Sequence, residues 1–264
     1  MQTFEYHRPD SADAAVAAMR EATEAKFLAG GQSLIPVMKL DLAAPSDLIS
    51  LGGVPDLVGI EEEGGEIVIG AMTTHAAVEE SELVAEKIPA LVEMMGVLGD
   101  PQVRNRGTIG GSLAHNDPAA DYPAAALGLN ATIVTDRRRV ASDDFFEGMF
   151  TTALAEDELI TSVRFPVPDA AGYHKIRSPS SRYALVGVLV SRASGGVRVA
   201  VTGARRGVYR WSEAESALAS DFSPEALADL DHPTDGVVSD PDASAEYRAH
   251  LVSVAARRAV TACL

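Results

Sequence analysis

Two Gly-Gly pairs, each next to a hydroxyl side chain, are the residues of this chain best suited to hold a phosphorylated ligand. The first pair, Gly30 and Gly31, lies in KFLAGGQSLIPVMKL just before Ser33. A strand that ends in glycines and leads into a helix exposes backbone N–H groups at the positive end of the helix dipole, where a pyrophosphate binds. Glycine suits this place because a Cβ would block both a positive-φ turn and the approach of phosphate oxygens. An ordinary strand-to-helix turn with a serine cap explains this segment, taken alone, equally well.

The second pair, Gly110 and Gly111, lies in GDPQVRNRGTIGGSLAHNDPAADYPA between the hydroxyls of Thr108 and Ser112. These hydroxyls can donate to phosphate or flavin oxygens, and a carboxylate such as Asp121 can accept from ribityl or ribose hydroxyls. Neither segment contains GxxxxGK[ST] or a GxGxxG after a strand, so nucleoside-triphosphate and Rossmann dinucleotide sites lack their defining residues. Two separated glycine loops instead indicate an extended ligand that is held at two points.

Two polar residues of the second segment have ordinary explanations. Asp117 precedes Pro118, so an Asx-type turn explains it as well as a ligand contact does. His115 is interpreted as structural or solvent-facing, with a place in a cofactor wall as the less favoured alternative.

Short apolar strands alternate with helical stretches along the chain, which indicates mixed α and β structure. Ser11 fits the N-cap of an amphipathic helix that runs to Arg20. Further strands are expected at 26–31 and 47–51, after a turn within 61–72, and as an antiparallel pair at 182–192 and 196–204. Further helices are expected at 33–40, within 73–99 with a break before Pro89, at 211–220 and at 244–264. After Gly107 we expect a glycine turn, a polar loop, an Ala-rich helix and a strand. The first glycine pair is thus expected between a strand and a helix, and the second in a turn.

Composition excludes several classes of protein and site. The chain has 264 residues, 47% of them hydrophobic and 23% charged, as in soluble globular proteins rather than disordered or collagen-like chains. No apolar run is long enough to span a bilayer and the N-terminus lacks a signal-peptide pattern, so we expect a cytoplasmic protein. The single cysteine, Cys263, cannot hold an iron–sulfur cluster, and the six histidines show no zinc-type spacing. Any redox chemistry therefore needs an organic cofactor.

Charge divides the chain into two parts. Residues 1–168 carry 27 acidic and 11 basic side chains, whereas residues 169–264 carry 11 of each. This change coincides with two prolines and a glycine in FPVPDAAGYHK, and it predicts one domain at 1–168 and a second at 169–264. The net charge of −16 would repel nucleic-acid phosphates, so we expect no nucleic-acid partner.

Three segments, AGGQSLIPVMKL, DPQVRNRGTIGGSLAHNDPAADYPA and DPDASAEYRAHLVSVAARRAV, resemble the medium, FAD-binding subunit of molybdenum hydroxylases of the aerobic carbon monoxide dehydrogenase and xanthine dehydrogenase type. The resemblance covers essentially the whole chain, and both glycine motifs are long and specific. It implies an α+β fold, with a two-lobed FAD-binding domain of the vanillyl-alcohol oxidase (PCMH) type at 1–168 and a small α+β C-terminal flavoprotein domain at 169–264. The implied cofactor is FAD.

The resemblance also implies roles for the residues of both glycine motifs. One set, with the adjoining leucine, matches the first FAD-pyrophosphate loop: Ala29, Gly30, Gly31, Gln32, Ser33 and Leu34. The other set matches the second loop: Thr108, Ile109, Gly110, Gly111 and Ser112. Replacing Gly31 or Gly110 by Val is predicted to block the approach of the backbone to pyrophosphate, and so to lower FAD occupancy while the fold survives.

Further residues match the rest of the family's FAD site. Asp121 matches a carboxylate on the adenosine side of FAD, and Tyr183 matches an aromatic residue that the C-terminal domain lays against the flavin ring. A stacked ring would tune the flavin, although a tyrosine before an apolar strand also fits an ordinary core. Relatives often place a basic side chain four residues before this tyrosine, where Pro179 stands here. Lys175 and Arg177 are nearby candidates for that charge.

A flavin domain without iron–sulfur ligands, a recognisable molybdopterin site or a base–nucleophile pair can accept and pass on electrons but cannot itself hydroxylate a substrate. The resemblance implies that electrons from a molybdopterin-containing large subunit reach FAD through a two-iron two-sulfur small subunit, and then leave for quinone or NAD. We therefore expect an oxidoreductase subunit of a doubled heterotrimer, with no catalytic residue and no metal of its own. It does not span a membrane, but the complex can attach it to the inner face of one.

Two alternatives use the same fold. A self-sufficient FAD-dependent oxidoreductase would carry its own substrate pocket and a titratable group beside the flavin. A scaffold protein would keep the fold without the flavin, which the intact glycine loops disfavour. Because the substrate is chosen at the molybdenum site on another chain, no residue here selects among carbon monoxide, purines, aldehydes and other substrates.

Overall fold

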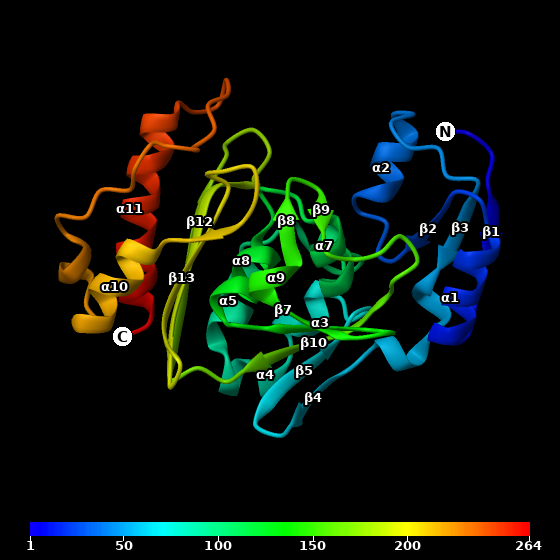
Figure 1. The fold of residues 1–264 in the computed structure, drawn as a ribbon, viewed down its shortest axis with the longest axis horizontal. Coiled ribbons are helices and arrows are strands. Elements are labelled where there is room, and N and C mark those ends of the chain that lie inside the picture. The colour runs from blue at the N-terminus through cyan, green and yellow to red at the C-terminus, as the bar shows by residue number, and fades with distance from the viewer.

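The computed structural model describes residues 1–264, and it consists of three layers of secondary structure that lie side by side (Figure 1). The N-terminal lobe, at one end, is built on a parallel sheet with strand order β1–β3–β2. Its elements are β1 (Glu5–His7), α1 (Ala12–Glu21), β2 (Ala25–Leu28), α2 (Leu34–Lys39) and β3 (Asp47–Ser50), followed by 3-10 turns at Leu51–Gly53 and Pro55–Leu57. Ser11 caps α1, as predicted, by accepting a hydrogen bond from the backbone N–H of Ala14.

The second lobe, in the centre of Figure 1, is built on an antiparallel sheet with strand order β4–β5–β10–β6–β7. Its strands are β4 (Ile60–Glu63), β5 (Glu66–Gly70), β6 (Thr132–Thr135), β7 (Arg139–Ala141) and β10 (Ile160–Pro166). A run of helices connects β5 to β6: α3 (His75–Glu79), α4 (Glu82–Lys87), α5 (Pro89–Gly96), α6 (Pro101–Arg104), α7 (Ile109–His115) and α8 (Asp121–Gly128). Between β7 and β10 lie α9 (Ser142–Phe145) and a hairpin of β8 (Phe146–Gly148) and β9 (Thr151–Thr152).

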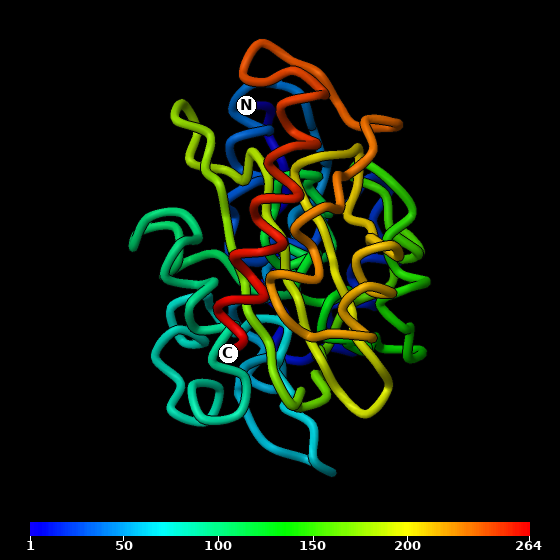
Figure 2. Tube along the Cα trace, turned by 90° about the vertical axis from the view of Figure 1, so that its left-hand side faces the viewer, coloured from blue at the N-terminus to red at the C-terminus, as the bar shows by residue number.

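The third layer is an antiparallel sheet with strand order β11–β12–β13–β14. Its strands are β11 (Ala170–Arg177), β12 (Ala184–Ala193), β13 (Gly196–Thr202) and β14 (Tyr209–Arg210), and they are followed by α10 (Ser212–Ser220), a 3-10 turn at Pro224–Leu227 and α11 (Ala245–Ala262). Figure 2 shows α11 running along the outer face of this sheet. The central strand β12 is almost wholly buried because α11 packs against it on one side and α8 on the other. None of the helices combines the length and apolar character that crossing a bilayer requires.

The predicted α+β class is confirmed, and most predicted elements are present. The break before Pro89 is confirmed, because this proline begins α5. The glycine turn expected after Gly107 is wrong: Ile109–His115 form α7, since Thr108 caps that helix and outweighs the poor helix propensity of two glycines. Strand β11 has no counterpart among the predicted elements, because it begins within a segment whose prolines and glycine indicate a linker. The domain division at residue 168 stays a prediction.

Candidate functional site

A cavity of about 980 Å³ has walls from both lobes and from the third layer. This volume is at the upper end of the roughly 300–1,000 Å³ that ligand sites usually have. Nearly all predicted site residues line the cavity: Ala29, Gly30, Gly31, Gln32, Ser33, Leu34, Thr108, Gly110, Gly111, Ser112, Asp121 and Tyr183. Ile109 does not line it, because its side chain is fully buried in the core of the second lobe.

The first glycine pair brings the backbone of the N-terminal lobe against the second lobe. A Cβ at Gly30 would lie 2.0 Å from the carbonyl oxygen of Arg106, so a side chain cannot fit between the two backbones. Gly31 has a φ of +72°, in the left-handed region that glycine adopts without strain. The two glycines thus have separate tasks, since one allows close contact between the lobes and the other makes the turn.

The turn into α2 leaves a row of hydrogen-bond donors without a partner in the protein. Four successive backbone N–H groups have no acceptor, those of Gly30, Gly31, Gln32 and Ser33. The Ser33 hydroxyl is also free, because it makes no capping bond to α2. All four residues line the cavity. Free N–H groups on a glycine loop are suited to phosphate oxygens, so this loop fits the pyrophosphate of FAD.

The second glycine pair lies in the first turn of α7, where its N–H groups already have acceptors. The Gly110 N–H donates to the carbonyl oxygen of Ala71 at 2.9 Å, and the Gly111 N–H donates to Thr108 Oγ1 at 3.2 Å. A Cβ at Gly110 would lie 2.6 Å from the Cβ of Ala71. Gly110 is therefore needed so that α7 can pack against the end of β5, which is a different reason from the approach to pyrophosphate expected from the sequence.

The second loop still offers hydroxyl groups to the cavity. Thr108 Oγ1 accepts the capping bond from Gly111 and keeps its own hydrogen free to donate. The Ser112 hydroxyl lines the cavity from the same turn of the helix. The first loop thus presents backbone N–H groups to a ligand, and the second presents side-chain hydroxyls.

Asp121 takes part in a buried polar cluster in the cavity wall. It is 4% exposed, its Oδ2 pairs with Lys175 Nζ at 2.8 Å, and the Tyr173 hydroxyl donates to its Oδ1 at 2.5 Å. Burial, together with the charge of Asp121, raises the pKa of Tyr173 well above its usual value. Of the two basic candidates, Lys175 lines the cavity and Arg177 does not. The cluster fastens β11 to the start of α8.

Tyr183 reaches the cavity from the connection between β11 and β12, and its side chain is 51% exposed. Burial of its hydroxyl and the negative charges of Asp117 and Asp121 raise the pKa of Tyr183. Asp117 forms the Asx-type turn that the sequence offered as one explanation, because its Oδ1 accepts a hydrogen bond from the Ala119 N–H at 2.8 Å. Tyr183 is therefore an accessible aromatic group in the cavity wall, and it is not a core residue.

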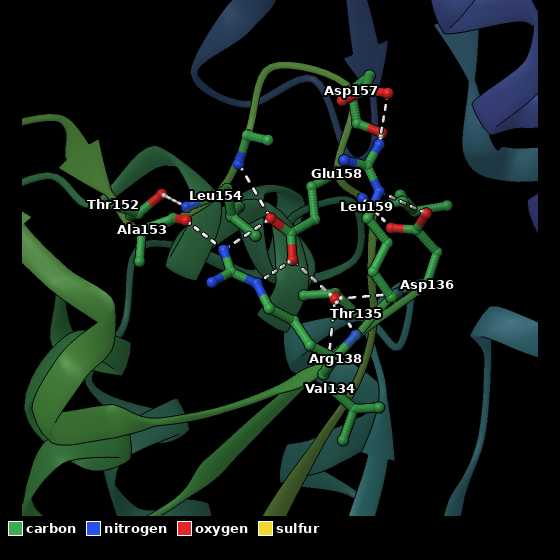
Figure 3. Close-up of polar contacts among 12 residues, drawn as sticks. Val134, Thr135, Asp136, Arg138, Thr152, Ala153, Leu154, Asp157, Glu158 and Leu159 are labelled. Carbon is green, nitrogen blue, oxygen red and sulfur yellow. Dashed lines mark hydrogen bonds and ion pairs between the residues drawn. The ribbon is translucent and has the colours of Figure 1, made fainter.

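A short segment before β10 joins the two lobes beside the cavity (Figure 3). Asp157 accepts a hydrogen bond from Arg20 of α1 at 2.9 Å. Glu158 accepts two hydrogen bonds from Arg138, at 2.8 and 2.9 Å, and the Arg138 guanidinium lowers the pKa of Glu158 to about 2. Leu159 packs into the core of the N-terminal lobe. Successive residues of this segment are thus anchored in different lobes.

Several residues of the wall have no signal in the sequence. The cavity is also lined by His75, Phe150 and Glu158. His115 lines it too, although the sequence favoured a structural or solvent-facing position for this residue. Burial lowers the pKa of His75 to about 4, so its imidazole is neutral at pH 7. These residues belong to separate elements and share no sequence motif, so only the folded structure brings them together. No group of three or more His, Cys, Asp or Glu side chains is placed to hold a metal ion.

The chain matches the family described as the FAD binding domain in molybdopterin dehydrogenase over residues 2–168. It is 39% identical to the nicotine 6-hydroxylase medium subunit of Paenarthrobacter nicotinovorans, across 98% of this chain and 97% of that protein. It is 37% identical to the carbon monoxide dehydrogenase medium chain of Hydrogenophaga pseudoflava, across 98% and 96%. Among solved structures, reconstituted CO dehydrogenase from Oligotropha carboxidovorans superposes with a TM-score of 0.92 at 36% identity, covering 99% of this chain and 98% of that one.

Proposed function

We propose that this chain, which belongs to the family of FAD-binding medium subunits of molybdenum hydroxylases, receives electrons from the iron–sulfur clusters of a partner subunit and passes them through FAD to quinone or NAD. The chain is an oxidoreductase subunit and its cofactor is FAD. One observation carries the proposal: a single cavity is lined by both glycine loops, with four free backbone N–H groups on one and two hydroxyls on the other.

The residues of the cavity divide the work of holding FAD. The free N–H groups of residues 30–33 would hold the pyrophosphate, and the hydroxyls of Thr108 and Ser112 would donate to further oxygens of the cofactor. Tyr183, an exposed aromatic side chain of the cavity wall, would contact the flavin ring. When bound, FAD supplies the capacity to take up two electrons from one partner and give them to another.

The partners follow from the division of chemistry among subunits. The relatives are named as medium subunits or medium chains, which supports a large molybdopterin subunit and a small iron–sulfur subunit for this chain as well. The complex is then a heterotrimer, itself doubled, and its substrate is chosen at the molybdenum site of the large subunit. This chain contributes the FAD end of the electron path.

Anaerobic rapid mixing tests this electron path. The FAD-loaded chain is mixed either with the reduced small subunit or with candidate organic substrates, while the flavin absorbance is followed. We expect bleaching by the reduced iron–sulfur subunit and no bleaching by organic substrates. The small subunit without its clusters is the matched control and should be inactive.

Two outcomes contradict the proposed path. Bleaching of the isolated chain by an organic substrate indicates a self-sufficient FAD-dependent oxidoreductase. A chain that is colourless and takes up no added FAD indicates a scaffold that has lost the cofactor. Both outcomes are measured on the wild-type chain in the absence of partner subunits.

A further inference from the structure

The imidazole of His75 is a buried polar group in the cavity wall. His75 is the first residue of α3, is 5% exposed and lines the cavity. Its Nδ1 is buried and has no hydrogen-bond partner in the protein. A ring with an unpaired buried nitrogen is costlier to bury than an apolar ring of similar size. Packing alone therefore does not explain a histidine at this position, and its other nitrogen, Nε2, is the one left for a partner.

The two sides of the His75 ring have different surroundings. On one side lies the fully buried Tyr122, with the ring centroids 5.2 Å apart. On another lies Gly107, where a Cβ would come within 2.6 Å of His75 Nε2. Gly107 lines the cavity and Tyr122 belongs to the core of the second lobe. The Nε2 edge of the ring is thus directed toward the cavity, and a glycine at 107 leaves that edge uncovered.

His75 is fixed between the two glycine loops. Its backbone N–H donates to the carbonyl oxygen of Gly107 at 3.0 Å, and Thr74 forms an antiparallel bridge with Thr108. The first loop lies against the same glycine, because a Cβ at Gly30 would be 2.8 Å from the Cα of Gly107. The imidazole and the first loop are therefore neighbours across one glycine, and the second loop begins at the next residue.

The hydrogen of the His75 ring belongs on Nε2. Burial and the charge of the nearby Arg104 lower the pKa of His75 to about 4, so the ring carries a single hydrogen at pH 7. A hydrogen on Nδ1 would be a buried donor without an acceptor. Buried N–H groups in that situation are rarer than acceptors with an unused lone pair. The ring thus presents one N–H donor on its cavity side.

The position of this donor suits the pyrophosphate of FAD. The adjoining first loop presents the free N–H groups of residues 30–33, and Thr108 presents its hydroxyl at the start of α7. An N–H that donates to an anionic phosphate oxygen forms a charge-assisted hydrogen bond, which is stronger than a bond between neutral groups. Donors from the first loop, α7 and α3 thus lie next to Gly107.

We propose that His75 is a further FAD-binding residue whose Nε2–H donates to an oxygen of the cofactor's pyrophosphate. This role rests on the proposed function, because it requires FAD in the cavity. It adds the start of α3 to the two glycine loops as a third element that holds the phosphates.

Fluorescence titration of the full chain with FAD tests this role through two contrasting variants. His75→Gln keeps an N–H donor at the place of Nε2, whereas His75→Phe keeps a ring without a donor. We expect the Kd for FAD to rise about 10- to 100-fold in His75→Phe and to stay within about threefold of wild type in His75→Gln. A packing role against Tyr122 predicts the opposite order, because the phenylalanine preserves the ring contact and the glutamine removes it.

Two further variants complete the titration. His75→Asn places its amide near the position of Nδ1 and not of Nε2, so it should bind FAD as weakly as His75→Phe. His232→Gln is the matched control, because His232 is also 5% exposed with an unpaired Nδ1 but does not line the cavity. Its affinity for FAD should equal that of wild type. Equal losses of affinity in His232→Gln and His75→Phe would make burial of a histidine the cause and overturn the role.

Phosphorus NMR of FAD bound to the same chains gives a readout that does not depend on affinity. At saturating FAD, the pyrophosphate resonances should move between wild type and His75→Phe, since one hydrogen bond to a phosphate oxygen is lost. His75→Gln should restore the wild-type positions. Weaker FAD binding in His75→Phe with unchanged phosphorus resonances would place the contact on another part of FAD and overturn the pyrophosphate assignment.

Failure of the His75 role and failure of the proposed function look different. A wild-type chain that takes up no FAD contradicts the proposed function itself. A wild-type chain that binds FAD, with the same Kd and the same phosphorus resonances in His75→Phe, contradicts the role of His75 alone.

Discussion

The two glycine loops share a sequence pattern, yet the structure uses them differently. Gly30 and Gly31 belong to a turn whose N–H groups are free, and Gly31 has a φ of +72°. Gly110 and Gly111 belong to a helix, and their N–H groups are bonded to Ala71 and Thr108 within the protein. The first pair is therefore arranged for a ligand, and the second pair is arranged for packing and helix capping.

A Gly-Gly motif therefore indicates where a cofactor site lies but not why each glycine is needed there. A glycine can be required by a positive φ, by a nearby backbone or by a ligand, and these causes are indistinguishable in the sequence. Substitutions in the first loop should therefore lower FAD affinity more than stability. Substitutions at the second glycine pair should lower stability more than FAD affinity. The following substitutions test that contrast.

The largest loss of stability is expected for Gly110→Val, which should destabilise the fold strongly. Its Cβ would lie 2.6 Å from the Cβ and 2.8 Å from the carbonyl oxygen of Ala71, so α7 must move away from β5. Overpacking of this kind costs about 1–3 kcal/mol and more where the backbone is involved. Thermal unfolding followed by circular dichroism measures the loss. A variant that melts like wild type but lacks FAD would assign phosphate binding to the second loop.

Gly31→Val should reduce FAD affinity by at least about tenfold, or about 1.4 kcal/mol, while the chain still folds. Valine is strained at a φ of +72°, so the turn must change and its N–H groups no longer converge on phosphate. Fluorescence titration with FAD measures the affinity. Gly64→Val is the matched control, because Gly64 has a φ of +64° in a turn away from the cavity. Equal loss of FAD in both variants would make strain the sole cause.

Thr108→Ala should lower the free energy of unfolding by about 1 kcal/mol, because α7 loses its capping oxygen. FAD binding should also weaken, since the same hydroxyl faces the cavity. Urea denaturation and FAD titration measure the two effects. Thr74→Ala removes the cap of α3, outside the cavity, and should reduce stability without changing FAD affinity. If the two variants bound FAD equally well, Thr108 would have a structural role alone.

The smallest effect is expected for Ser33→Ala. The Ser33 hydroxyl makes no capping bond, so the free energy of unfolding of the FAD-free chain should stay within about 0.5 kcal/mol of wild type. Loss of one hydrogen bond to FAD should raise the Kd about 2- to 10-fold. A clear loss of stability with unchanged FAD affinity would make Ser33 a structural residue of α2.

Much of this site is predictable from the sequence because local signals and a long family resemblance agree. Ser11 caps α1, Gly31 makes a turn before a helix, and Tyr183 reaches the cavity from a loop. Helix α7 is the exception, since two glycines indicate a turn by propensity whereas the Thr108 cap and contact with Ala71 favour a helix.

The parts of the site that the sequence does not predict depend on contacts between residues far apart in the chain. Phe150 has an unremarkable sequence context, and its positive φ results from hydrogen bonds to Asn116, 34 positions earlier. Asp121 meets Lys175 because β11 lies beside the start of α8, which no spacing in the sequence encodes. Such pairings follow from the packing of three layers, and a single sequence does not specify them locally.

Hydrogen–deuterium exchange of the full chain, with and without FAD, tests most directly whether the first loop holds the phosphates and the second is structural. The N–H groups of residues 30–33 have no acceptor in the protein, so they should exchange rapidly without FAD and become strongly protected when it binds. The N–H groups of Gly110 and Gly111 should exchange slowly in both states. New protection at Gly110 and Gly111, with residues 30–33 unchanged, would contradict the account.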